Sequence, residues 1–116
     1  MKRSPVHLLP EAEREVEQAF WWYERQQTGL GLEFLLAFEA AVESLRRLPE
    51  GHEIVALRTR KALLRRFPYL VLYALEEERI VITAVFHGRR DPQRWSDRVR
   101  EGASAQESLR AQRISA

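Results

Sequence analysis

Arginine, tyrosine and histidine side chains interrupt an otherwise apolar segment between residues 61 and 95. Arginine presents a planar fork of donors that fits phosphate or carboxylate, and histidine exchanges protons near neutral pH. Burying such groups without partners is costly. The segment therefore predicts either a binding surface or polar groups that the fold itself satisfies. The groups concerned are Arg65, Arg66, Tyr73, Thr83, His87, Arg89 and Arg90.

A trial register assigns these groups to the two faces of a sheet. We expect strands at residues 62–67, 70–75 and 79–87, joined by a turn at Pro68-Tyr69 and a second turn with Glu77 at its tip. One face is then nearly all apolar and is expected to pack on helices, with Arg65 as its single charge. A slip of one residue in either turn would move a strand's side chains to the other face. The opposite, mixed face carries Arg66, Tyr73, Thr83 and His87, and Arg58 and Arg60 extend it if the alternation continues upstream.

The mixed face has the groups needed to bind RNA and, in one mechanism, to cleave it. His87 would be the general acid or base in attack by a 2′-hydroxyl, and Arg66 would stabilise the charge on phosphorus. The alternative is that Arg66 is exposed and that His87 ends an edge of the sheet, hydrogen-bonded to the backbone. The candidates for binding alone are Arg58, Arg60, Lys61, Arg65, Tyr73, Thr83, Arg89 and Arg90.

The elements that position these groups follow from hydrophobic periodicity. Residues 6–9 predict a short edge strand, and apolar spacings of three and four predict helices over residues 10–26 and 32–48. Residues 54–57 are a short strand or an extended connection. The fold class is therefore α+β: an N-terminal short strand and an antiparallel helical hairpin packed on one face of an antiparallel β-meander. We expect one domain over residues 1–95, and a polar C-terminal tail over 96–116 that is a short helix or disordered.

Composition and charge restrict the class of protein. The chain has no cysteine, so disulfides and thiolate metal sites are excluded. Because no metal-ligand cluster, Gly-rich phosphate loop, signal peptide or membrane span is evident, we expect a cytoplasmic protein without metal, cofactor or membrane partner. Residues 1–53 carry six basic and ten acidic groups (net −4), whereas residues 54–116 carry thirteen and seven (net +6). This asymmetry favours an anionic partner for the C-terminal half, either nucleic acid or an acidic protein segment.

Several blocks of the sequence occur in a recognisable order. They are Trp22-Tyr23-Glu24, Gly29-Leu30-Gly31 and Phe34 in the helices, then Arg65-Arg66-Phe67-Pro68-Tyr69, Tyr73, and Ala84-Val85-Phe86-His87-Gly88-Arg89-Arg90-Asp91-Pro92. Together they resemble the RelE/ParE superfamily of toxins from type II toxin–antitoxin systems, and the resemblance covers roughly residues 5 to 95. They are similar to the ParE-like, plasmid-stabilisation branch.

The resemblance implies a growth-inhibiting toxin that a cognate antitoxin neutralises in a hetero-oligomer. RelE-like members are ribosome-dependent, metal-independent mRNA endoribonucleases, whereas ParE-like members inhibit DNA gyrase without a known catalytic group. Arg66 or Arg65, together with His87, lies where some ribonuclease members place catalytic residues. No carboxylate shares the expected polar face, however, and the lysine cluster of those members is reduced to Lys61. These departures favour inhibition of a target such as gyrase over cleavage of mRNA, and a non-toxic basic binding module is the third alternative.

Overall fold

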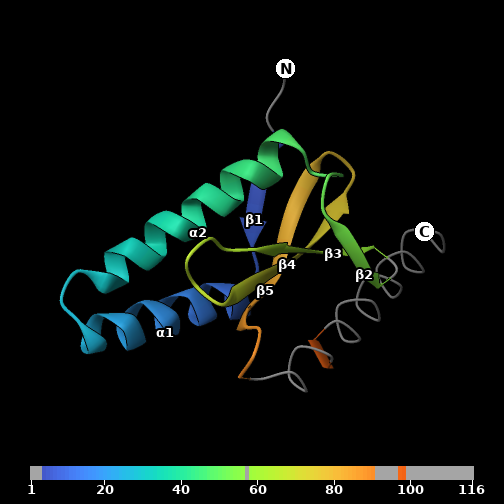
Figure 1. Ribbon diagram of the computed structural model, residues 1–116. Coiled ribbons are helices and arrows are strands. Elements are labelled where there is room, and N and C mark those ends of the chain that lie inside the picture. The colour runs from blue at the N-terminus through green and yellow to red at the C-terminus, as the bar shows by residue number, and fades with distance from the viewer. Residues whose placement is uncertain (1–3, 57, 91–96, 99–116) are drawn as a thin grey trace.

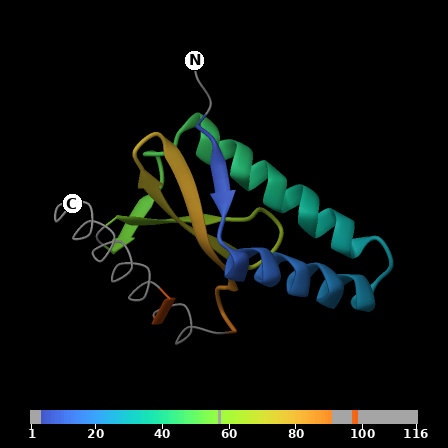
Figure 2. The same cartoon turned by 180° about the vertical axis from the view of Figure 1, so that it is seen from behind.

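A helical hairpin lies on one face of a five-stranded sheet in the computed structural model, which describes residues 4–56, 58–90 and 97–98 (Figure 1). The sheet has the order β1-β5-β4-β3-β2; β2 to β5 are antiparallel and β1 runs parallel to β5 at the edge (Figure 2). This arrangement confirms the expected α+β class. The elements are β1 (Val6–Leu8), α1 (Pro10–Gln26), α2 (Leu30–Arg47), β2 (Glu53–Ala56), β3 (Thr59–Leu63), β4 (Tyr69–Glu76) and β5 (Arg79–His87).

Helix α1 begins at a proline rather than at a polar capping residue. Leu9 is extended and supplies no side-chain cap, and Pro10 occupies the first turn, where a missing N–H costs no hydrogen bond. Glu11 and Glu13 lie in that turn and interact favourably with the positive end of the helix dipole. No helix within the described residues is both long and apolar enough to cross a membrane.

The turn between the two helices depends on Glu24, Gly29 and Gly31, three residues of the sequence blocks named above. The Glu24 carboxylate accepts hydrogen bonds from the backbone N–H groups of Gly29 (3.1 Å) and Gly31 (3.0 Å), so a side chain of α1 caps α2. Gly29 has φ of +92°, which favours glycine. At Gly31 a Cβ atom would lie 2.8 Å from the carbonyl oxygen of Phe20, so only glycine allows the helices this close.

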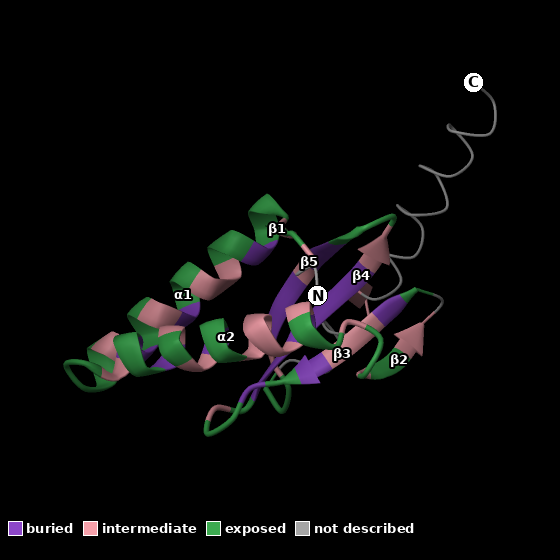
Figure 3. Ribbon diagram, turned by 90° about the horizontal axis from the view of Figure 1, so that it is seen from above, coloured by how far each residue is buried: buried purple, intermediate pink, exposed green. Residues whose placement is uncertain are grey.

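The main core lies between the helical hairpin and the sheet, and Figure 3 colours the buried residues of the helices and strands purple. The helices contribute Ala12, Ala19, Tyr23, Phe34, Phe38 and Leu45, and the strands contribute Val71, Tyr73, Ile80, Ile82 and Val85 among others. Leu48, the last residue of the helix expected over residues 32–48, lies just beyond the end of α2 at Arg47 and is 68% exposed.

The helices cover the side of β4 that the trial register assigned to binding, so the assignment was wrong for β4 and for the end of β5, whereas Ile80 and Ile82 face the helices as expected. The core against the helices includes Tyr73, whereas Leu70, Leu72, Ala84 and Phe86 form a smaller cluster with Val55 and Ala56 on the other face. Both faces are therefore buried. The sequence could not show which face of β4 lies against the helices, because the side chains on both faces of β4 are mostly apolar.

The register errors have identifiable causes. The first turn spans residues 64–68, so Leu63, not Phe67, pairs with Leu70. At the second turn Glu76 pairs with Arg79, one position away from the trial register, which places Ile80 and Ile82 beside Tyr73 on the helix side. A bulge at Thr83 then shifts the alternation again, so that Ala84 and Phe86 face the other way.

Candidate functional site

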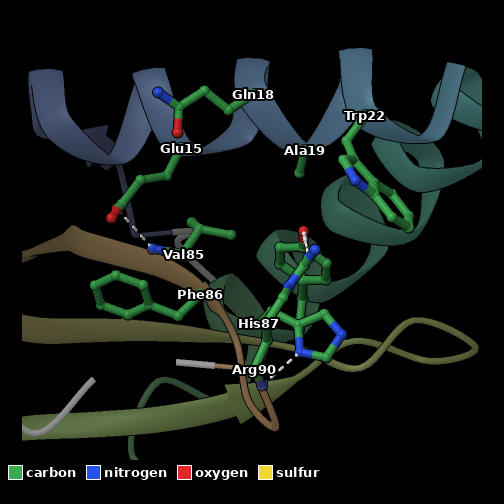
Figure 4. A pocket seen from close by; sticks show the side chains of 9 residues that line it. Glu15, Gln18, Ala19, Trp22, Val85, Phe86, His87 and Arg90 are labelled. Atoms are coloured by element: carbon green, nitrogen blue, oxygen red, sulfur yellow. Dashed lines mark hydrogen bonds between the residues drawn. The ribbon is translucent and has the colours of Figure 1, made fainter. Parts of the chain in front are cut away.

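A cavity of about 160 Å³ opens between α1 and the C-terminal end of β5 (Figure 4). One wall is helical and the other is the end of the sheet with the turn that follows it. Apolar and charged side chains share this lining, as in many ligand sites. The lining residues are Glu15, Gln18, Ala19, Trp22, Tyr69, Val85, Phe86, His87 and Arg90.

His87 uses one ring nitrogen to hold the turn after β5. Its Nδ1 accepts hydrogen bonds from the backbone N–H groups of Arg89 (3.3 Å) and Arg90 (3.0 Å). Two backbone N–H groups thus point at one ring nitrogen, so this side of the imidazole is used within the turn. The ring also contacts that of Tyr69, with centroids 5.3 Å apart and nearly perpendicular planes. The histidine therefore has a structural role at this turn.

Arg90 is fixed at the mouth of the cavity by two aromatic residues. Its guanidinium carbon lies 5.1 Å from the centroid of the Trp22 ring, and its Nη2 donates to the Tyr69 hydroxyl at 3.3 Å. This is a cation–π arrangement with one added hydrogen bond. Burial raises the pKa of the nearby Tyr23 above its ordinary value, and Tyr69 adds to this effect while the charge of Arg90 opposes it.

At the other end of the cavity, an ion pair bonds backbone groups of β5 that lie beyond the end of β1 and have no partner there among the described strands. Beyond Leu8, where β1 stops, the Glu15 carboxylate accepts the backbone N–H of Val85 (3.0 Å) and an Arg98 guanidinium bond (2.9 Å). Arg98 also donates to the carbonyl oxygen of Thr83 and lies 3.0 Å from the Glu11 carboxylate. Backbone groups at the edge of β5 are thereby satisfied by side chains where the parallel partner has ended.

Three of the candidate binding residues have their polar groups bonded inside the fold. Tyr73 is fully buried, and its hydroxyl donates to the carbonyl oxygen of Pro49 at 2.7 Å. Burial raises the pKa of Tyr73 to about 12, and the charge of Arg60 opposes this rise. Arg60 donates to the carbonyl oxygens of Glu50 (2.9 Å) and His52 (2.8 Å), and Thr83 donates to Leu72 (3.3 Å). Through these hydrogen bonds the polar groups of the three residues have a structural role. Their roles in binding stay predictions.

The expected catalytic pair is not brought together in the cavity. Arg66 is exposed in the loop of residues 64–68 with φ of 72° and does not line the cavity that contains His87. Arg90, expected only as a binding residue, takes the position beside the histidine. Sequence reasoning missed Glu15, Trp22 and Tyr69 as lining residues. The sequence predicts a helix at Trp22 and a turn at Tyr69, and nothing local marks Glu15 among the glutamates of α1.

Arginines from two loops gather at one end of the sheet. The Gly88 backbone N–H donates to the Pro68 carbonyl oxygen (2.8 Å), which joins the β3–β4 loop to the turn after β5. Arg65, Arg66, Arg89 and Arg90 are all exposed on these two segments, and together we call them the arginine end. The β4–β5 hairpin at the opposite end carries Glu76, Glu77 and Glu78.

The other two basic candidates lie away from the arginine end. Arg58 is exposed in the β2–β3 turn, and Lys61 forms a 3.2 Å ion pair with Glu53. Among the described residues, no group of three or more His, Cys, Asp or Glu side chains is arranged to hold a metal ion.

Fold and sequence together define the class of this protein as a small toxin of a toxin–antitoxin system. The sequence profile described as "ParE toxin of type II toxin-antitoxin system, parDE" matches residues 6–92. The chain belongs to this family of toxins, and membership implies an antitoxin partner.

Solved structures show the same fold. Eight solved chains match, among them one described as "Chromosomal ParDE TA system from P. aeruginosa", with a TM-score of 0.55 and 16% sequence identity. The match covers 72% of this chain and 94% of that one. A search of curated proteins gave no significant match.

Proposed function

We propose that this chain is a cytoplasmic, growth-inhibiting toxin that a cognate antitoxin neutralises and that acts by binding and inhibiting a protein target such as DNA gyrase. Family membership supports the toxin and the antitoxin partner. The observation that carries the mode of action is the bonding of His87, whose Nδ1 accepts the backbone N–H groups of Arg89 and Arg90. A histidine used to hold a turn, with Arg66 outside its cavity, supports inhibition by binding rather than RNA cleavage.

The alternative is a ribosome-dependent mRNA endoribonuclease, and one observation favours it. The cavity brings His87, Arg90 and Tyr69 together, and a histidine, an arginine and a phenol are groups that can transfer protons and stabilise charge at phosphorus. In that mechanism the imidazole must exchange a proton with substrate. Inhibition by binding has no such requirement, and this difference allows a sharp test.

His87→Asn separates the two modes of action. An asparagine Oδ1 can accept the same backbone N–H groups as Nδ1, so the turn is retained while the titrating ring is lost. We expect induced expression of this variant to arrest growth as the wild type does. Loss of arrest by a folded variant would instead favour the ribonuclease. His87→Ala, which removes both the ring and the acceptor, is the comparison that shows how much the turn itself matters.

Purified protein provides the direct test of the target. DNA supercoiling by gyrase should fall as the toxin is added, and primer extension on cellular mRNA should show no new cleavage ends after induction. New ends without an effect on supercoiling would overturn the proposed mode of action. Normal growth after induction of the wild type would favour the third reading, a non-toxic binding module.

A further inference from the structure

Arg90 is the charged group at the cavity whose charge is not balanced within the described part of the chain. Its guanidinium contacts the Trp22 ring and the Tyr69 hydroxyl, and no carboxylate of residues 4–56, 58–90 or 97–98 forms an ion pair with it. Glu15, the carboxylate in the same lining, is paired with Arg98. A cation held in place by aromatic side chains, with donors to spare, is preorganised for an anion.

We propose that this cavity binds the carboxylate of an acidic side chain from the antitoxin, with Arg90 as the charged donor; this inference rests on the neutralisation part of the proposed function. The Tyr69 hydroxyl engages Nη2 and the Trp22 ring lies against the guanidinium, so the orientation of the fork is set before the ligand arrives. Setting it in advance reduces the entropy lost on binding. The apolar wall of Ala19, Val85 and Phe86 suits the methylene groups of a glutamate.

A carboxylate fits this cavity better than a phosphate of RNA. An RNA phosphodiester carries one negative charge like a carboxylate, so the choice rests on the number of cations and on the apolar wall of the cavity rather than on charge. Binding along a nucleic-acid backbone uses many cations spread over a surface, whereas Arg90 is the single arginine among the described residues that line this cavity. The exposed Arg65, Arg66 and Arg89 of the arginine end lie outside the cavity and would attract an acidic segment toward it.

The binding test uses the full chain and defined probes. The probes are sodium acetate, the blocked peptide Ac-Ala-Glu-Ala-NH2, its glutamine counterpart and inorganic phosphate. Binding is followed by NMR at the Trp22 indole N–H and the Arg90 Nε–H. We expect saturable shifts with acetate and the glutamate peptide, and weaker binding of the glutamine peptide. Shifts of equal size with the glutamine peptide, or tighter binding of phosphate than of acetate, would overturn the inference.

Two substitutions with the same change of charge identify the donor. Arg90→Gln should weaken binding of the glutamate peptide by about tenfold or more, since a charge-assisted hydrogen bond is lost. Arg25→Gln is the matched control, because Arg25 is exposed one turn along α1 from Trp22 and lies outside the cavity lining. Equal affinities of the two variants would contradict the assignment. Trp22→Leu should reproduce part of the loss if the ring orients the guanidinium.

Growth assays keep failure of this inference apart from failure of the proposed function. If the wild type arrests growth on induction but shows no carboxylate binding, only the inference is overturned. If the wild type binds the glutamate peptide as expected but does not arrest growth, the cavity assignment is supported and the toxin function is overturned. The growth assay and the binding experiment use the same protein, and circular dichroism checks that it is folded.

Discussion

At the scale of single residues, the fold makes internal use of polar groups that could have served binding. Tyr73 is the clearest example, because it points into the core beneath the helices and donates its proton to the Pro49 carbonyl oxygen at 2.7 Å. This bond ties the loop after α2 to the centre of the sheet. Burial disfavours the charged phenolate and raises the pKa of Tyr73, so the side chain is kept as the neutral donor that this bond needs.

Tyr73 should make stability depend on pH in the alkaline range. Its pKa is 10.0 in its ordinary state and about 12 in the folded chain, so folding favours the protonated form. The stabilisation is complete below the unfolded pKa and is lost as pH rises through the folded value. We expect the free energy of unfolding, measured with urea, to fall between about pH 10 and 12.

Tyr73→Phe is the variant that tests this dependence. It should lower stability by about 1 kcal/mol at pH 7, because one buried hydrogen bond is removed while the ring is kept. It should also flatten the alkaline fall in stability. A variant that loses stability with the same alkaline slope as the wild type would show that other groups cause the fall.

At the scale of elements, the sequence predicted the order of helices and strands but not the faces of the sheet. The helices follow from local sequence: apolar spacing marks their buried sides, and Pro10 and Gly29 mark where α1 and α2 begin. Which face the helices cover could not be read from alternation, because both faces of β4 carry buried apolar side chains. The slip at the second turn misplaced Ile80 and Ile82 relative to β4, whereas the bulge at Thr83 compensates for that slip, so Ala84 and Phe86 share a face with Leu70 and Leu72 as expected.

Only some of the residues that line the cavity could be predicted from the sequence. His87 and Arg90 were candidates because their chemistry is visible in the sequence. Trp22 and Glu15 became cavity residues only through the packing of α1 against the end of β5. No local pattern encodes a contact between segments about 70 residues apart, such as the hydrogen bond from Val85 N–H to Glu15.

The close approach of the two helices gives a prediction at this scale. Gly31→Ala should destabilise the protein by about 1–3 kcal/mol, because the new Cβ meets both the ring and the backbone oxygen of Phe20. Gly29→Asn is the control in the same turn, since asparagine tolerates a positive φ and no atom lies within 4 Å of the added Cβ. Thermal unfolding measures both. A neutral Gly31→Ala would mean that the helices can separate at little cost.

At the scale of the whole molecule, charge is divided between the two ends of the sheet. The arginine end joins two loops through the Gly88–Pro68 hydrogen bond, and the β4–β5 hairpin at the other end is acidic. Such a separation orients an approaching charged partner before contact and raises the association rate. An acidic partner would therefore arrive at the end where the cavity lies, so the surface field and the cavity chemistry favour the same class of partner.

Reversing a charge at the arginine end should reduce association with an acidic partner without unfolding the chain. Arg65 is exposed in the 64–68 loop, so Arg65→Glu should leave the free energy of unfolding within about 0.5 kcal/mol of the wild type. It should slow association with the antitoxin by about tenfold at low salt, and the difference should shrink as salt screens the field.

Arg14→Glu makes the same change of net charge at an exposed position on α1 and should have a smaller effect on that rate. Stopped-flow association at two ionic strengths measures both. Equal slowing by the two variants would show that net charge alone governs encounter and that the arginine end has no directing role.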